Sequence, residues 1–330
     1  MNLFRDTYCA LNGNAPYPVE GKYTTLYVKI TDACNAKCPF CTFANKDKTF
    51  YFNVARFKDA LSLLSKHATI TKVSFTGGEP SLVRGLIDKC VDIVKTIDKN
   101  IFTVVNTNGS NILGLDNVKG LDNIALSRHH FDDDKNSGIF GTESVPTSKT
   151  LWSVASEKIH LSCTMMKGKI WNYKSISDYL EWANGIGIRD VGFVSLMPVN
   201  DFCRKYFVEF PDDKFFDERL VKNKVWNNGD ICRCANYLFL PKRGAKVVKL
   251  YTRFRCQHTA DSKSSLTFDG WDLRTNFNGK IIKEKDMENT VEETIKKQLD
   301  NSGFDYAVAI ATKAEVEAGA ACGQLAIINE

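Results

Sequence analysis

The chain has 330 residues and a formal net charge of +5; 43% of its residues are hydrophobic and 25% are charged, close to ordinary globular composition. A chain of this length buries roughly 75% of the surface that its unfolded form exposes, so its core needs no covalent cross-links. The mildly basic charge comes without a dense Lys/Arg tract, which argues against nucleic acid as a partner.

The N-terminal residues, MNLFRDTYCALNGNAPYPVEG, lack the basic and then apolar layout of a signal peptide. No apolar run approaches the roughly 20 residues that span a bilayer, so we expect no membrane partner. The 11 cysteines favour reduced thiols, some of them metal ligands, over a disulfide framework. Cys90 and Cys163 fall on apolar patterns and are expected to be packing residues. These features predict a cytoplasmic protein.

Between residues 20 and 200, short β-like runs alternate with helical patterns, which is typical of a parallel sheet built from strand–helix units. The expected strands are 25–31, 71–76, 101–106, 123–127, 159–164 and 190–196. The expected helices begin after Asn53, follow the second strand over 86–97, and lie near 175–184. In a parallel barrel or open barrel, chemistry collects at the C-terminal ends of the strands, so the informative residues lie in the loops that follow them.

Beyond residue 200 the pattern changes to acidic and aromatic segments and then to cysteines among β-rich runs. The segment SSLTFDGWDLRTNFNGKII predicts a hairpin with Asp269 and Gly270 at its turn. We therefore divide the chain into an N-terminal segment (1–22), a barrel (23–200) and a β-rich C-terminal extension (201–330).

The segment CNAKCPFC places Cys34, Cys38 and Cys41 directly after the first expected strand. Three thiols at this spacing converge on one point only in a wrapped loop, and they can then bind three irons of a 4Fe–4S cube, leaving the fourth iron open to a non-protein ligand. A structural zinc would require four protein ligands, and no partner pair lies nearby. A thioredoxin-like redox site needs only CxxC and leaves Cys34 unexplained.

This segment resembles the signature of the radical S-adenosylmethionine (SAM) superfamily, CxxxCx-aromatic-C, with Phe40 at the aromatic position. The resemblance implies that the amino and carboxylate groups of SAM chelate the open iron and that Phe40 packs against adenine. The segment TGGEP after the second strand resembles the superfamily's GGEP segment, which implies that Gly77, Gly78 and Glu79 contact the amino group of SAM.

The segment NTNGS resembles the molybdenum-cofactor cyclase-like branch of this superfamily. Its Asn106 and Asn108 suit recognition of ribose or carboxylate, although Asn-Gly is also a plain turn. Asn172 resembles a family residue near the ribose of SAM, and its alternative role is to open the loop before a helix.

The segment SRHHFDDD follows the fourth strand, where family members often contact the carboxylate of SAM. Ser127 and Arg128 are the residues at that place in this chain. His129 and His130 lie at the expected barrel mouth, so we expect substrate contact, with capping of the next element as the alternative.

The C-terminal extension resembles the twitch or SPASM extensions of the same branch, which carry an auxiliary 4Fe–4S cluster. The candidate ligands are Cys232, Cys234 and Cys256, with His258, Cys203 and Cys322 as further candidates. The chain departs from the family pattern because its first pair is CxC rather than CxxC, and TNFNG replaces the cysteine expected after the hairpin. An auxiliary cluster, unligated thiols and a Cys/His zinc site all stay open.

The resemblance implies an α/β fold with a partial (β/α)6 TIM-like barrel and a radical SAM enzyme activity. In such enzymes a 4Fe–4S cluster, reduced by a flavodoxin or ferredoxin-type partner, cleaves S-adenosyl-L-methionine to a 5′-deoxyadenosyl radical that abstracts hydrogen from a substrate. We favour a small molecule such as a nucleoside or nucleoside-sugar as the substrate, because we find no N-terminal peptide-recognition domain. The alternatives are cyclisation, epimerisation or cross-linking of a ribosomally made peptide, or a non-catalytic iron–sulfur or zinc protein.

Overall fold

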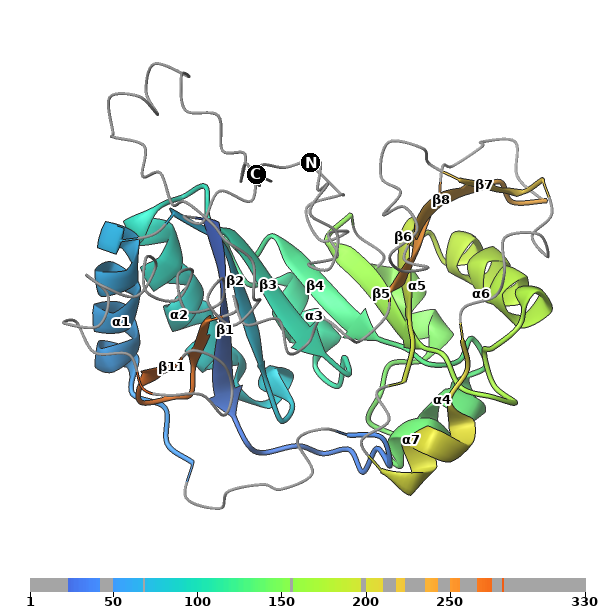
Figure 1. The fold of residues 1–330 in the computed structure, drawn as a ribbon, viewed down its shortest axis with the longest axis horizontal. Helices are drawn as coiled ribbons and strands as arrows, with labels where there is room; N and C mark the ends of the chain where they lie inside the picture. The colour runs from blue at the N-terminus through green and yellow to red at the C-terminus, as the bar shows by residue number, and fades with distance from the viewer. Residues whose placement is uncertain are drawn as a thin grey trace, which may run out of the picture.

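The computed structural model describes residues 23–41, 50–67, 69–154, 157–196, 200–209, 218–222, 235–242, 250–255, 266–274 and 281. The sheet that these residues form has 11 strands in the order β11-β10-β1-β2-β3-β4-β5-β6-β9-β8-β7 (Figure 1). Its centre is six parallel strands: β1 (Tyr23–Thr31), β2 (Thr69–Gly77), β3 (Phe102–Thr107), β4 (Asn123–Ser127), β5 (Ile159–Thr164) and β6 (Asp190–Val194). The predicted α/β fold with a parallel, barrel-like sheet is confirmed.

Helices follow these strands, and most of them share one apolar core with one face of the sheet. They are α1 (Val54–His67), η1 (Pro80–Val83), α2 (Arg84–Ile97), α3 (Ile112–Asp116), α4 (Asp133–Phe140), α5 (Ser148–Val154), α6 (Tyr173–Gly185) and α7 (Asp201–Tyr206). In Figure 1, α1 and α2 flank the β1 end of the central strands, and α6 flanks the β6 end. As predicted, α1 begins after Asn53, whose Oδ1 accepts the N–H of Arg56 at 3.0 Å.

The two faces of the central sheet differ in chemistry. Side chains alternate between faces along a strand, and one set, which includes Val28, Phe75 and Leu161, joins the helices in a continuous apolar core. We call the opposite side the inner face. Its polar residues include Lys29, Ser74, Asn106, Ser127, His160, Ser162, Thr164 and Asp190. The hydrophobic core therefore lies between the sheet and the helices, and the inner face is left for other contacts.

Strands from the C-terminal extension extend both edges of this sheet. At one edge β10 (Leu266–Phe268) pairs parallel with β1 and carries β11 (Leu273–Arg274). At the other edge β9 (Leu250–Arg255) pairs parallel with β6, followed by β8 (Ala235–Phe239) and β7 (Leu220–Lys222). These strands continue the barrel sheet rather than forming a sheet of their own. The division into domains at residue 200 stays a prediction.

The predicted hairpin turn is confirmed between β10 and β11. Gly270 has a φ of +105°, a conformation that L side chains rarely adopt. The Asp269 side chain accepts the backbone N–H of Trp271 at 3.0 Å and of Asp272 at 2.8 Å. Among the described residues, no helix is long and apolar enough to cross a membrane.

Replacing Phe268 by alanine tests whether β10 belongs to the main core. Phe268 is fully buried, and its ring centroid lies 5.5 Å from those of Phe52 and Phe57. We expect Phe268→Ala to lower the free energy of unfolding by about 3–5 kcal/mol, measured by chemical denaturation followed by circular dichroism. The transition should stay single, and Trp271→Ala in the adjacent exposed turn should cost much less. A separate second transition would show that the extension folds independently.

Candidate functional site

The cysteine loop, residues 34–41, begins three residues after the C-terminal end of β1. The backbone N–H of Ala36 donates to the Cys34 sulfur at 3.4 Å, and that of Cys41 donates to the Cys38 carbonyl at 3.2 Å. The three cysteines are half-buried, and none of them forms a disulfide. The chain therefore wraps locally around its own thiols, as the spacing predicts.

The glycines of the TGGEP segment bring the loop after β2 against the start of the cysteine loop. Gly78 donates its N–H to the Thr31 carbonyl, and Glu79 donates to the Ala33 carbonyl, both at 2.7 Å. A Cβ at Gly77 would lie 2.2 Å from the Thr31 oxygen, and one at Gly78 would lie 2.2 Å from the Ala33 oxygen. The glycines thus closely approach the protein's own backbone, and their expected contact with the amino group of SAM stays a prediction.

The Glu79 carboxylate joins the loops that follow β2 and β3. It is 2% exposed, and it accepts the N–H of Ser81 at 2.8 Å, the N–H of Asn108 at 2.7 Å and the hydroxyl of Thr107. A carboxylate has about four acceptor positions, so these bonds leave capacity for a further donor. The expected contact with an amino group of SAM stays a prediction.

The two asparagines of the NTNGS segment have different positions. Asn108 donates from Nδ2 to Asn35 Oδ1 at 2.9 Å, and Asn35 in turn donates to the Ser110 hydroxyl at 2.7 Å. This network links the cysteine loop to the loop after β3. Asn106 lies on the inner face and donates to the Ser74 hydroxyl at 2.8 Å.

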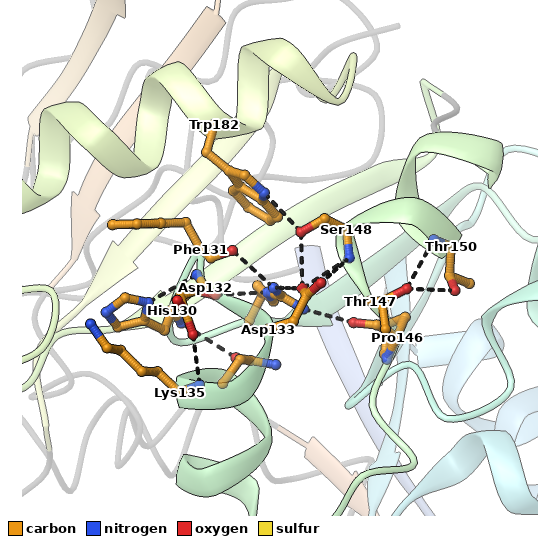
Figure 2. A network of polar contacts seen from close by, with 12 residues as sticks. His130, Phe131, Asp132, Asp133, Lys135, Pro146, Thr147, Ser148, Thr150 and Trp182 are labelled. Carbon is orange, nitrogen blue, oxygen red and sulfur yellow. Dashed lines mark hydrogen bonds and ion pairs between the residues drawn. The ribbon is translucent and has the colours of Figure 1, made fainter.

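Arg128 is 1% exposed and bonds to several residues that Figure 2 labels, among them His130, Asp133 and Pro146. Its guanidinium donates to the carbonyls of His130 at 2.7 Å and Pro146 at 2.6 Å, and it forms an ion pair with Asp133. These partners are all internal to the protein, and the expected contact of Arg128 with the carboxylate of SAM stays a prediction. Of the two neighbours Ser127 and Arg128, it is Ser127, half-buried at the end of β4, that lies on the inner face.

Asp133 extends this network from α4 to α5 and α6. It accepts the backbone N–H and the hydroxyl of Ser148, each at 2.9 Å, and the Trp182 indole donates to the same hydroxyl at 3.0 Å (Figure 2). Burial raises the pKa of Asp133, but hydrogen bonds from Arg128 and Ser148 outweigh it and leave the pKa below its usual value. The network fixes the position of the segment that follows β4.

His129 and His130 are both buried, with rings held by backbone groups. Nδ1 of His129 accepts the N–H of Thr164 at 3.0 Å, and Nδ1 of His130 accepts the N–H of Asp132 at 3.0 Å. Burial and the nearby Arg128 lower the pKa of His129 to about 3, and burial is also the main cause of a lowered pKa at His130. Each ring is thus neutral with its proton on Nε2. Their substrate contact stays a prediction.

Helices α4 and α7 lie beside one another in Figure 1, and both pack against the cysteine loop at Phe40. The Phe40 ring is edge-on to His129 at 5.1 Å and lies 6.5 Å from Phe202 of α7. Lys37 donates its N–H to the Phe140 carbonyl at 2.8 Å, and Asn200 donates to the Pro39 carbonyl at 2.9 Å. Helix α7 was not predicted from the sequence, although Asn200 is a recognisable N-cap.

Asn172 and the remaining cysteines have mainly structural contacts. Asn172 caps α6 through a reciprocal capping box with Ser175, so its alternative role at the helix start is confirmed. Cys90 and Cys163 are fully buried, and burial raises the pKa of Cys90 to about 12, which confirms them as packing residues. Cys203 is fully buried in an apolar cluster. The other expected ligands, Cys232, Cys234, Cys256, His258 and Cys322, lie outside the described residues.

The structure reveals one polar pair that the sequence analysis missed. His160 of β5 and Asp190 of β6 lie on the inner face, with His160 Nδ1 3.2 Å from Asp190 Oδ1. The alternation in IHLSCT, where His160, Ser162 and Thr164 alternate with apolar residues, was the signal that a polar face was present.

The three thiols of the cysteine loop have the ligand chemistry that an iron–sulfur cluster requires. In the part of the chain that the structure describes, no group of three His, Cys, Asp or Glu side chains is arranged to hold one metal ion. In a 4Fe–4S cube each thiolate binds a different iron, so its sulfur ligands lie further apart than those of one ion. An all-thiolate set with no carboxylate or imidazole ligand also suits iron–sulfur chemistry.

The family model described as the Radical SAM superfamily matches residues 28–197, and the chain belongs to this superfamily. The superfamily uses a 4Fe–4S cluster and SAM. A probable GTP 3′,8-cyclase of Thermoplasma volcanium is 31% identical over 121 residues, covering 36% of this chain and 37% of the relative. The GTP 3′,8-cyclase of Psychromonas ingrahamii is 26% identical over 214 residues, covering 61% of each. The chain thus matches less than two thirds of either relative.

A solved structure with a similar fold is the radical SAM methyltransferase from Sphaerobacter thermophilus. It is 15% identical, with a TM-score of 0.49, over 79% of this chain and 72% of that protein.

Replacing Gly77 by alanine tests the contact between the two loops. Its φ of +131° and the overlap with the Thr31 carbonyl should cost about 2–4 kcal/mol of folding free energy. We expect a lower thermal unfolding midpoint, measured by scanning calorimetry. The matched control is Gly85→Ala at the start of α2, where an added Cβ meets no atom within 4 Å. Equal midpoints for the two variants would contradict the contact.

Proposed function

We propose that the chain is a radical SAM enzyme that binds its 4Fe–4S cluster through Cys34, Cys38 and Cys41 and acts on a small polar molecule such as a nucleoside or nucleoside-sugar. The observation that carries the proposal is the position of the cysteine loop. It follows β1. Ala33, the residue just before it, accepts the N–H of Glu79 in the loop after β2, and Asn35 within it accepts the side-chain N–H of Asn108 in the loop after β3. Three loops of an open parallel sheet therefore meet around three thiols and a buried carboxylate.

Several residues of the chain would orient SAM beside the thiols. The Glu79 carboxylate and the Ser127 hydroxyl offer hydrogen-bond acceptors at the ends of β2 and β4. Phe40, which packs against His129 and Phe202, offers an aromatic face to adenine. The bound cluster supplies one electron to the homolytic cleavage of SAM. Helices α4 and α7 cover this side of the loop and limit the access of water.

The names of the relatives support a nucleoside-type substrate. The Psychromonas and Thermoplasma relatives are named for a cyclase that acts on GTP, and they match the central region of this chain. The reductant in this proposal is a flavodoxin or ferredoxin-type protein.

Replacing each loop cysteine by alanine tests the cluster and its activity together. We expect anaerobically reconstituted wild type to form 5′-deoxyadenosine from SAM under dithionite, and Cys34→Ala, Cys38→Ala and Cys41→Ala each to lose it by at least about 100-fold. The matched control is Cys90→Ala, a packing thiol that should keep the activity. Product is measured by chromatography and iron by a colorimetric assay. A wild type that forms no 5′-deoxyadenosine would overturn the proposal.

We also propose that the C-terminal extension binds a second 4Fe–4S cluster through Cys232, Cys234 and Cys256. Two clusters contain about eight irons per chain, and the double variant Cys232→Ala with Cys234→Ala should retain about four. Iron and acid-labile sulfide are measured on the reconstituted full chain. A wild-type value of about four irons would exclude the second cluster.

A further inference from the structure

His129 lies in the turn that follows β4, next to the cysteine loop. Its ring stacks on Phe140 with the centroids 4.8 Å apart, and it meets the Phe40 ring edge-on at 5.1 Å. Phe40 is part of the cysteine loop, and Phe140 belongs to an apolar cluster against which Cys34 and Cys38 pack. The imidazole is therefore one of the side chains that surround the cysteine loop.

The two nitrogens of the His129 ring differ in their partners. Nδ1 accepts the backbone N–H of Thr164 at 3.0 Å, so the ring proton is on Nε2. Nε2 has no hydrogen-bond partner among the described residues. In this part of the chain it is also not one of the unpaired side-chain atoms that the protein encloses completely, so it faces accessible space. His129 thus presents a donor, and only a donor, to a ligand that binds beside it.

The backbone around His129 is fixed by buried side chains. Asn136 Oδ1 accepts the N–H of His129 at 2.9 Å and that of His130 at 3.3 Å. Arg128 Nε donates to the His130 carbonyl at 2.7 Å, and the Tyr179 hydroxyl donates to the Arg128 carbonyl at 2.9 Å. The side chains of Asn136, Arg128 and Tyr179 belong to residues that are each 1% exposed or less. Such a network orients the side chain at its centre before a ligand binds, as the supporting residues of binding sites do.

The charged donor of this turn is already engaged inside the protein. The Arg128 guanidinium has four internal acceptors, which are the carbonyls of His130, Phe131 and Pro146 and the carboxylate of Asp133. The amino-acid end of SAM carries an amino group, which needs an acceptor, and a carboxylate, which needs a donor. Glu79 has acceptor capacity left for the amino group. The N–H at Nε2 of His129 supplies a donor for the carboxylate.

We propose that His129 donates a hydrogen bond from Nε2 to the carboxylate of SAM. His129 is the binding residue, and Arg128 and Asn136 are positioning residues that hold its backbone. The inference rests on the proposed function, since it concerns how the same site binds SAM, and it assigns His129 to SAM rather than to the substrate. Because Nδ1 is occupied by a backbone N–H, the ring has no lone pair to accept a proton, so its role is binding and not general base catalysis.

The test measures the binding of SAM and of decarboxylated SAM, which lacks only the carboxylate, by calorimetry. The protein is the anaerobically reconstituted full chain with its cluster left oxidised, so that SAM is not cleaved. His129→Phe keeps a ring to stack on Phe140 but removes the donor, and it should weaken SAM binding by at least about tenfold. It should change the binding of decarboxylated SAM by less than about twofold, because the group that His129 binds is missing.

A second variant guards against a purely structural effect of the first. His129→Asn can still accept the N–H of Thr164 through Oδ1, but its side chain is too short to replace Nε2, so it should also weaken the binding of SAM alone. The matched control is His160→Phe, the same substitution at the start of β5, at the end of the sheet opposite the cysteine loop. This control should bind SAM as wild type does.

The outcomes separate this inference from the proposed function. Equal dissociation constants for SAM in wild type and both His129 variants would overturn the inference and leave the proposed function standing. Equal losses for SAM and decarboxylated SAM would also overturn it, because His129 would then act only through the structure of the site. A wild type that carries its cluster but does not bind SAM would overturn the proposed function and the inference together.

Discussion

The site depends on two backbone hydrogen bonds of 2.7 Å, from Gly78 to the Thr31 carbonyl and from Glu79 to the Ala33 carbonyl. They join the loop after β2 to the chain just before the first cysteine, and only glycine at positions 77 and 78 permits so close an approach. Once that contact is made, the Glu79 carboxylate reaches the loop after β3. Backbone hydrogen bonds thus fix the start of the cysteine loop, and the buried Glu79 carboxylate joins the loops after β2 and β3.

Periodicity and spacing were enough to predict the central fold. The six expected strands agree with β1–β6 to within about two residues at each end, because alternating apolar residues and cap signals are local. Local patterns could not show that Arg128 turns inward, since its acceptors are carbonyls brought together by the fold. Nor could they show that β9 and β10 join opposite edges of the sheet, which is a matter of long-range pairing.

The asymmetry between the two faces of the sheet connects the fold with the chemistry. The side chains on one face pack with the helices in a single apolar core, and the other face carries the polar groups. Residues that order the site, such as Arg128 and Glu79, form hydrogen bonds with internal partners.

The way the sheet is completed has a consequence for how the protein is made. β1 pairs on one side with β10, where Leu26 is opposite Leu266, and β6 pairs with β9, where Asp190 is opposite Tyr251. During synthesis the six central strands therefore leave the ribosome with both sheet edges unpaired, and unpaired edges promote association between chains. The edges are covered only after residues 250–268 emerge, so a truncated barrel lacking them would be prone to aggregate. The C-terminal strands thus protect the nascent barrel as well as completing its sheet.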